Sequence, residues 1–334
     1  MPSPKTAVLV TREMFSRCFA ARDIERIRAV TDCRLPSDAE WDDAAQSAVI
    51  AGTEIVITGW GTRPLTTAML DTAPDLRLMC HSAGSIKHLV SETFQARGIR
   101  VCSAAAALAV GVAEFAFGLM LVSMKAAWQW NDCTRQGVWN REKALEWVRE
   151  PYGATVGIVG ASLVGREMIR LCKTLELAAI LLYDPYVSEE QAKELGVERV
   201  ELNELMRRSD VVSLHTPATE ETRHIVNARN LALLRDRAIF INTARGMCVD
   251  EPALIRELES GRIMACIDVT DPEPPAPGSP LYTLPNCILT PHVAGAIKEN
   301  THRQGRLVAD EIEAYVEGRP LKHEVDLTQL HRLA

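Results

Sequence analysis

Short apolar runs alternate with helix-like stretches along most of the chain. In the first third, runs of strand length occur at residues 6–10, 54–60, 76–84 and 99–104. Six more runs follow, at residues 154–160, 178–184, 210–216, 237–243, 265–270 and 287–291. Helical stretches separate most of these runs, and repeated strand–helix alternation is typical of a parallel, doubly wound sheet. We therefore expect an α/β protein.

Three helices are expected from other signals. Residues 103–125 form a long segment with few charges, rich in Ala and Gly, for which a buried helix between two domains fits better than a membrane span. Residues 297–321 are amphipathic, and this helix could return across the first domain. The third helix has Asp250 as its cap, Pro252 in its first turn and Gly261 after its end.

The segment 126–152 differs from the rest because it holds four of the six tryptophans among charged residues (Trp128, Trp130, Trp139 and Trp147). A tryptophan-rich connection of this kind often packs against a partner surface. Packing within the monomer is an equal alternative.

Composition narrows the class of protein. The 334 residues are 47% hydrophobic and 24% charged, which is typical of a globular protein with ample core. A net charge of −7 and a pI near 5.7 argue against binding to nucleic acid or to anionic membranes. The N-terminal apolar run is too short for a signal peptide, so we expect a cytoplasmic protein. The nine cysteines include no C-x-x-C pair, so we expect reduced, buried thiols and no metal site.

Polar or ionisable residues follow nearly every predicted strand of residues 153–292, where ligands bind in open α/β sheets. After the first strand the sequence is GASLVG, a dinucleotide-type turn with Gly160 and Gly165 in place but Ser162 at the middle glycine position. Asp184 lies 24 residues beyond Gly160, where a carboxylate can bind both ribose hydroxyls and repel a 2′-phosphate. This favours NAD over NADP. The alternative is that Asp184 is only a turn residue before Pro185.

One arginine, one carboxylate and one imidazole follow three of these strands: Arg245, Glu273 and His292. Such a set suits hydride chemistry on a 2-keto acid. The arginine fork holds the substrate carboxylate and polarises the carbonyl. The histidine donates a proton to the carbonyl oxygen, and the carboxylate beside it stabilises the imidazolium. Taken singly, each residue has an ordinary structural explanation, such as an ion pair between Arg245 and Asp250.

With these residues in place, the chain resembles the D-isomer-specific 2-hydroxyacid dehydrogenases over nearly its whole length. The matching stretches are VGIVGASLVGREM, LLYDPY, VVSLHTPATEETRHIVN, AIFINTARGMCVDEPALIRELESGRI, IDVTDPEP and LPNCILTPHVAGA. The resemblance implies two Rossmann-like domains. One is a flavodoxin-like substrate domain of residues 1–108 and 300–334, and the other is an NAD-binding domain of residues 109–299. It also implies an active site in the cleft between them and a homodimer formed largely through the cofactor domain.

The resemblance assigns roles to individual residues. Arg245, Glu273 and His292 form the catalytic set, and Asp268 holds the nicotinamide amide group. The expected NAD(H) site consists of Gly160, Ser162, Leu163, Val164, Asp184, His215, Thr216, Thr243, Ala244, Arg245, Asp268, His292 and Gly295. The expected substrate site consists of Trp60, Gly61, Ala83, Gly84, Ser85, Arg245 and His292, with main-chain amides of residues 82–85 binding the carboxylate.

Three departures from the family pattern leave questions open. Ser162 replaces a glycine, the usual Asn-Ile-Asp is absent after SAGS, and the segment between Gly261 and Asp268 is one residue short. The last leaves Asp271 as a second candidate to pair with His292. Trp60 is either a wall of the substrate pocket or ordinary packing at a strand end.

The expected substrate is a small 2-keto or 2-hydroxy acid. No arginine cluster in the first domain marks a phosphate site, so glyoxylate or hydroxypyruvate is favoured. A non-enzymatic, NAD-sensing protein similar to the related transcriptional corepressors is the alternative of another class.

Overall fold

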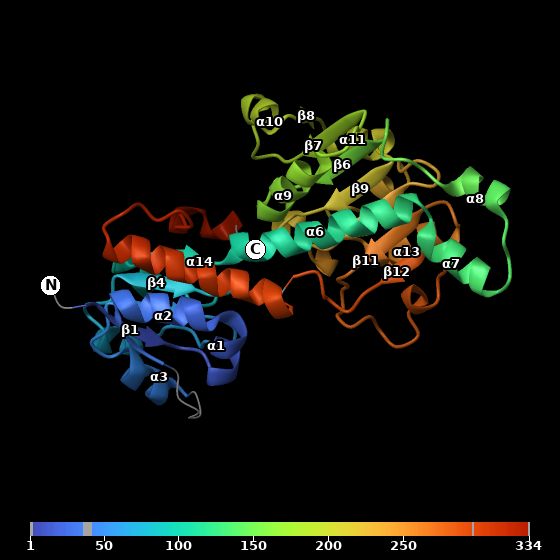
Figure 1. Ribbon diagram of the computed structural model, residues 1–334. Coiled ribbons are helices and arrows are strands. Elements are labelled where there is room, and N and C mark those ends of the chain that lie inside the picture. Colours follow the sequence, from blue (N-terminus) through green and yellow to red (C-terminus); the bar gives the residue numbers. More distant parts are fainter. Residues whose placement is uncertain (1–2, 36–41, 296, 333–334) are drawn as a thin grey trace. The chain divides into compact units, whose positions relative to one another are not determined.

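The computed structural model describes residues 3–35, 42–295 and 297–332 (Figure 1). By its internal contacts the chain divides into two compact units, Met1–Leu108 with Ala296–Ala334 and Ala109–Gly295. Each unit contains one parallel sheet, of five strands in the first and seven in the second. The prediction of an α/β protein with two such sheets is confirmed.

The first unit has the strand order β2-β1-β3-β4-β5, which is flavodoxin-like as predicted. The strands are β1 (Lys5–Val8), β2 (Asp32–Arg34), β3 (Ile55–Thr58), β4 (Leu78–His81) and β5 (Arg100–Ser103). Successive residues of a strand point to opposite faces, so Ala7 and Leu9 lie in one core cluster and Val8 and Val10 in the other. The edge strand β2 was not predicted because its three residues include two that are charged and exposed.

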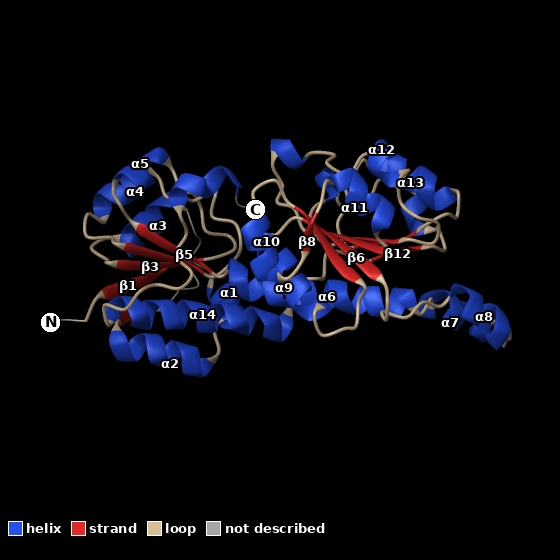
Figure 2. Ribbon diagram, turned by 90° about the horizontal axis from the view of Figure 1, so that it is seen from above, coloured by secondary structure: helices blue, strands red, loops and turns tan. Residues whose placement is uncertain are grey.

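Helices cover both faces of this sheet (Figure 2). On one face lie α1 (Arg12–Cys18), α2 (Ala21–Val30) and α14 (Lys298–Val316). On the other lie α3 (Asp43–Ile50), α4 (Thr67–Thr72) and α5 (Glu92–Ala96). The prediction that the C-terminal helix returns across the first domain is confirmed, because α14 packs on α1 and α2 through Val308, Ala309 and Ile312.

The second unit has the strand order β12-β11-β10-β9-β6-β7-β8. The strands are β6 (Thr155–Val159), β7 (Ala179–Tyr183), β8 (Glu198–Arg199), β9 (Val211–Leu214), β10 (Ile239–Asn242), β11 (Met264–Ile267) and β12 (Cys287–Leu289). Six of them match the predicted runs, whereas the two polar residues of β8 gave no apolar signal. The chain order reverses between β6 and β9, and ligands bind at the carboxyl ends of strands at such a switch point.

One face of the seven-stranded sheet is covered by α6 (Ala105–Met124), α9 (Leu163–Cys172) and α10 (Glu189–Leu195). By length and composition alone α6 could cross a membrane. Its residues Ala113, Ala116 and Met120, however, pack in the core against Val156 and Ile158 of β6, as expected for a core helix.

The other face of the seven-stranded sheet carries α11 (Leu202–Arg208), α12 (Ala228–Leu231) and α13 (Glu251–Glu259). The predicted start of α13 is confirmed, because the Asp250 side chain accepts a hydrogen bond from the Ala253 amide and Pro252 lies in the first turn. Gly261 follows the helix with φ of +72°. Two further helices, α7 (Ala127–Arg135) and α8 (Arg141–Trp147), extend beyond one end of this sheet in both ribbon views.

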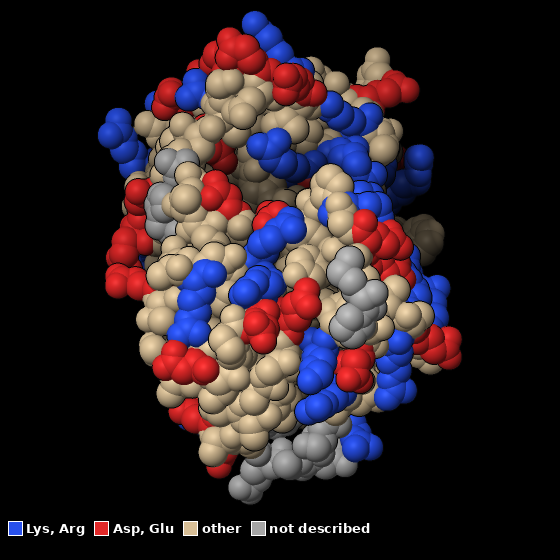
Figure 3. Space-filling model, turned by 90° about the vertical axis from the view of Figure 1, so that its left-hand side faces the viewer, with Lys and Arg blue, Asp and Glu red and all other residues tan. Residues whose placement is uncertain are grey.

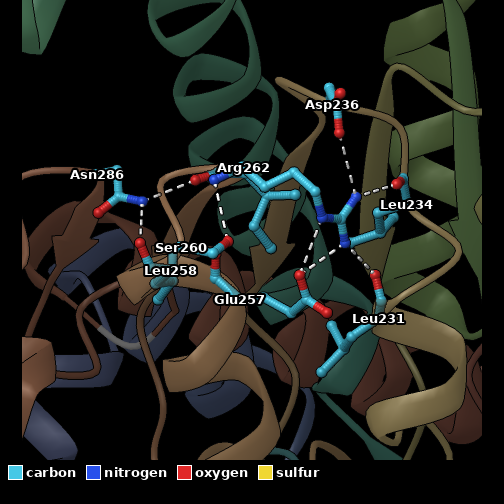
Figure 4. A network of polar contacts seen from close by, with 9 residues as sticks. Leu231, Leu234, Asp236, Glu257, Leu258, Ser260, Arg262 and Asn286 are labelled. Atoms are coloured by element: carbon cyan, nitrogen blue, oxygen red, sulfur yellow. Dashed lines mark hydrogen bonds and ion pairs between the residues drawn. The ribbon is translucent and has the colours of Figure 1, made fainter.

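Arg262 braces the edge of the sheet where β10 to β12 begin (Figure 4). Its guanidinium contacts Glu257 at 2.7 Å and donates to the carbonyls of Leu231 and Leu234. Beside it, the Asn286 amide donates to the carbonyls of Leu258 and Ile263, both at 2.8 Å. This network satisfies carbonyls at the ends of α12 and α13 and in the adjoining loops, at the sheet edge opposite the strand-end residues, so its role is in stability.

The surface charges and the cysteines indicate no second functional site among the described residues. Positive and negative side chains are interspersed on the face drawn in Figure 3. All nine cysteines are free and seven are buried. Burial raises the pKa of the Cys172 thiol to about 12. Among the described residues no cluster of His, Cys, Asp and Glu could hold a metal ion.

Candidate active site

The glycine loop between β6 and α9 tolerates no side chain at two positions. Gly160 has φ of +95°, and a Cβ there would lie 3.0 Å from the carbonyl of His215 at the end of β9. A Cβ on Gly165 would lie 2.0 Å from the Gly160 carbonyl oxygen. Only glycine meets both conditions, so the loop holds α9 tightly against the end of the sheet.

Ser162 is the N-cap residue of α9. Its Oγ accepts a hydrogen bond from the Gly165 amide at 3.3 Å. The sequence could have indicated this role, because serine directly before an amphipathic helix is a common cap. Leu163 and Val164 occupy the first two helical positions, whose N–H groups have no partner within a helix and suit a phosphate. The Ser162 hydroxyl keeps its own proton for donation.

We expect Ser162→Ala to bind NADH several-fold more weakly than the parent and Ser162→Gly to bind nearly normally. Loss of a serine cap costs about 1 kcal/mol with alanine but only a few tenths with glycine, and the alanine also removes the hydroxyl donor. Fluorescence titration with NADH measures both affinities. Equal affinity of the alanine variant and the parent would leave the hydroxyl without a role.

Asp184 is tied to the glycine loop and also closes its own turn. One carboxylate oxygen accepts a hydrogen bond from the Ala161 amide at 2.7 Å, and the other accepts from the Tyr186 amide at 2.8 Å. The ribose role and the turn role, treated as alternatives from the sequence, are therefore compatible. Each oxygen retains acceptor capacity for a hydroxyl group.

Three buried polar atoms at the ends of β9 and β10 lack hydrogen-bond partners among the residues that the structure describes. They are His215 Nδ1, Thr216 Oγ1 and Thr243 Oγ1. Burial lowers the pKa of His215 to about 3, so the ring is neutral at neutral pH, and its Nε2 lies 2.9 Å from Ser213 Oγ. Buried polar atoms normally have partners. Together with the glycine loop, these atoms fit a dinucleotide.

The turn carrying Arg245 packs directly on the turn that follows β11. Arg245 follows β10, and the Asn242 side chain holds the turn by accepting from the Ala244 amide at 3.0 Å and donating to the Arg245 carbonyl at 3.1 Å. A Cβ on Gly246 would lie 2.0 Å from the Thr270 carbonyl carbon. This main-chain contact fixes the spacing between the arginine turn and the loop that bears Glu273.

His292 and Glu273 form a pair. The Nδ1 of His292 lies 2.7 Å from the Glu273 Oε1, and the two side chains are 47% and 44% exposed. The structure thus places Glu273, and not Asp271, beside the imidazole. Because Nδ1 faces the carboxylate, Nε2 is the nitrogen left to exchange a proton with a substrate.

Asp268 anchors the loop that carries His292. One carboxylate oxygen accepts from Thr290 Oγ1 at 2.6 Å and from the Val293 amide at 2.9 Å. The other accepts from the Ala294 amide at 3.0 Å. His292 itself has φ of +52°, a conformation that a non-glycine residue needs such anchoring to hold. No signal in the sequence indicates this role, which is additional to the expected nicotinamide contact. Gly295 directly follows the anchored residues Val293 and Ala294.

The predicted substrate residues of the first unit lie at the ends of two neighbouring strands. Trp60 and Gly61 follow β3, and Ala83, Gly84 and Ser85 follow β4. A Cβ on Gly59 would lie 2.6 Å from Ser82 Oγ, so the two turns are in close contact. Trp60 is partly buried against the core and Gly61 has φ of +84°. Packing and pocket-wall roles remain compatible for Trp60.

Comparison with known proteins identifies a matching family. Residues 117–294 match the model of the D-isomer specific 2-hydroxyacid dehydrogenase, NAD binding domain. The chain is 35% identical to a glyoxylate reductase of Korarchaeum cryptofilum over 260 residues, 77% of this chain and 78% of that protein. It is 32% identical to a D-3-phosphoglycerate dehydrogenase of Archaeoglobus fulgidus over 263 residues, which are 78% of this chain. The match spans about half of that longer protein, 49%.

A solved structure supports the fold. The phosphoglycerate oxidoreductase of Rhizobium etli superimposes with a TM-score of 0.84, covering 97% of this chain and 98% of that one, at 22% identity. At this identity the likeness concerns the fold alone.

Proposed function

Because the chain belongs to the D-isomer specific 2-hydroxyacid dehydrogenase family, we propose that it catalyses reversible hydride transfer between NAD(H) and a small 2-keto or 2-hydroxy acid. The observation that carries this proposal is the His292–Glu273 pair at 2.7 Å, held on a loop next to the Arg245 turn. An acid–base pair beside a guanidinium is the equipment that carbonyl reduction requires.

In the reducing direction a 2-keto acid, NADH and a proton give a 2-hydroxy acid and NAD. The bound cofactor supplies the hydride. Arg245 binds the substrate carboxylate and polarises the carbonyl with its planar fork of donors. His292 donates the proton from Nε2 to the carbonyl oxygen, while Glu273 stabilises the imidazolium through Nδ1. In the oxidising direction the same nitrogen accepts the hydroxyl proton.

We assign NAD rather than NADP as the cofactor. The Asp184 carboxylate accepts hydrogen bonds from the Ala161 amide of the glycine loop and from the Tyr186 amide of its own turn, so a fixed negative charge lies where a 2′-phosphate would be repelled. Glyoxylate or hydroxypyruvate is the preferred substrate, with Trp60 and Gly61 beside the substituent on the carbonyl carbon. The glyoxylate reductase similarity is consistent with this assignment but does not distinguish it from other small keto acids.

The decisive experiment is a panel of 2-keto acids supplied with NADH or NADPH, following the cofactor's absorbance. We expect oxidation of NADH with at least one small unphosphorylated keto acid and much slower oxidation of NADPH. Measurable NADH binding without turnover of any acid would favour the non-enzymatic, NAD-sensing alternative instead.

A homodimer is the proposed assembly. Helices α7 and α8 and the link between them expose large apolar side chains, with Trp139 86% exposed and Val138, Leu145 and Trp128 also exposed. Exposed apolar groups clustered on an extension mark contact sites. Light scattering should give twice the chain mass, and Trp139→Glu should shift it towards the monomer. A monomeric parent would contradict the proposal.

We place the protein in the cytoplasm, with neither nucleic acid nor membrane as a partner. The net charge of −7 disfavours binding to nucleic acid and to anionic membranes. Cell fractionation tests it, since recovery in the membrane fraction would contradict it.

A further inference from the structure

The loop after β4, Ser82–Ser85, presents two consecutive main-chain N–H groups without partners. Within the described part of the chain, the amides of Gly84 and Ser85 donate no hydrogen bond. Gly84 is only partly buried and Ser85 is exposed. Two adjacent free amides are a suitable binding site for one carboxylate.

The hydroxyl of Ser103 accounts for the direction of these amides. Ser103 is the last residue of β5, which pairs with β4, and it is 8% exposed. Its Oγ donates to the Gly84 carbonyl at 2.8 Å and lies 3.2 Å from the Ala83 carbonyl oxygen. The same Oγ accepts from the Ala105 amide at 3.2 Å, which fixes the hydroxyl itself.

The planar peptide bond links the direction of each carbonyl to the direction of the next amide. The peptide bonds of the loop are trans, so each carbonyl points opposite to the N–H of the next residue. With the Ala83 and Gly84 carbonyls drawn to one oxygen, the Gly84 and Ser85 amides must point away from Ser103, out of the loop. We propose that Ser103 is a positioning residue, whose hydroxyl aims the loop amides that bind the substrate carboxylate.

A second serine anchors the start of the loop independently. Ser82 donates to the Thr58 carbonyl twice, from its amide at 2.7 Å and from its Oγ at 2.9 Å. These bonds attach the loop to β3 but leave the peptide planes after Ala83 free to rotate. Among the described residues, Ser103 alone is bonded to those planes, so its loss should disturb amide direction while the loop stays attached.

The test compares Ser103→Ala with Ser103→Thr, which keeps the hydroxyl. Thr31→Val is the matched control, because it also removes a buried hydroxyl that donates to a carbonyl of the same unit (Ile27, 2.8 Å). Thr31 lies before β2 and therefore not at a strand end where the substrate is expected. For Ser103→Ala we expect the KM for the keto acid and the Kd of oxamate, an unreactive carboxylate analogue, to rise up to about tenfold, the most that one hydrogen bond provides. The Kd of NADH should stay unchanged. Ser103→Thr should recover most of the loss.

The inference rests on the proposed function, and the readouts separate the two. Oxamate affinity of the NADH-bound protein is measured by titration and needs no turnover. If the parent binds oxamate but reduces no keto acid, the proposed function fails and the Ser103 comparison still stands. The inference is overturned if Ser103→Ala keeps the parent's oxamate affinity, if Thr31→Val weakens it equally, or if the parent binds no oxamate.

Discussion

Replacement of His292 by alanine is expected to lower kcat for keto-acid reduction by about 10²–10⁴-fold, the range that a positioned proton donor contributes. The physical reason is that no other described residue on this loop has an imidazole paired with a carboxylate. NADH affinity should change little, because the glycine loop and Asp184 lie on other strand ends. Steady-state kinetics with NADH and the best acid of the panel measure the loss.

The pairing of His292 provides its own control. Glu273→Gln removes the charge that faces Nδ1 and should lower kcat substantially at neutral pH. Asp271→Asn changes the neighbouring carboxylate, which makes no bond to the imidazole, and should leave kcat near the parent value. A His292→Ala variant that reduces substrate at close to the parent rate would show that the acid is another group.

Replacement of Arg245 by lysine is expected to lower kcat/KM by about 10²–10³-fold, comparable with the loss of one donor that stabilises a developing oxyanion. The positive charge survives in this variant, but an ammonium cannot supply two parallel donors to a carboxylate. The loss should appear in both KM and kcat, because the arginine both binds the carboxylate and polarises the carbonyl.

Arg170→Lys is the matched control for this substitution. Arg170 lies at the end of α9 and pairs with Glu167 at 2.8 Å on the surface, so the same exchange there should leave kinetics unchanged. A mild effect of Arg245→Lys would show that the arginine contributes little to carboxylate binding and would leave the main-chain amides after β4 as its main binding groups.

The features that could be predicted from the sequence are those set by residues close together in the chain. Apolar runs predicted six strands of the second unit, and Asp250, Pro252 and Gly261 marked α13, because periodicity and capping act within a few residues. The chemical types of the candidate site were also visible, since Arg245, Glu273 and His292 each follow a strand. The short polar strands β2 and β8 were missed because they bury too little to leave a signal.

What could not be predicted depends on contacts between distant segments. The sequence left both Glu273 and Asp271 as partners for His292, because a difference of two residues in a loop is settled only by the path of the main chain. The anchoring of the His292 loop by Asp268 and the contact of Ser103 with the SAGS carbonyls join residues about 20 or more apart. Ser162 was read as a missing glycine, although its capping role is local.

The close approach at Gly246 has a consequence for laboratory evolution of this chain. The spacing between the arginine turn and the acid–base loop is set by main chain against main chain, with no side chain between them to vary. Libraries that hold positions 246 and 270 constant therefore preserve the spacing between Arg245 and the His292–Glu273 pair while other positions are varied. Diversity aimed at new keto acids belongs in the turn after β3, which lies in the other unit and can change without disturbing that register.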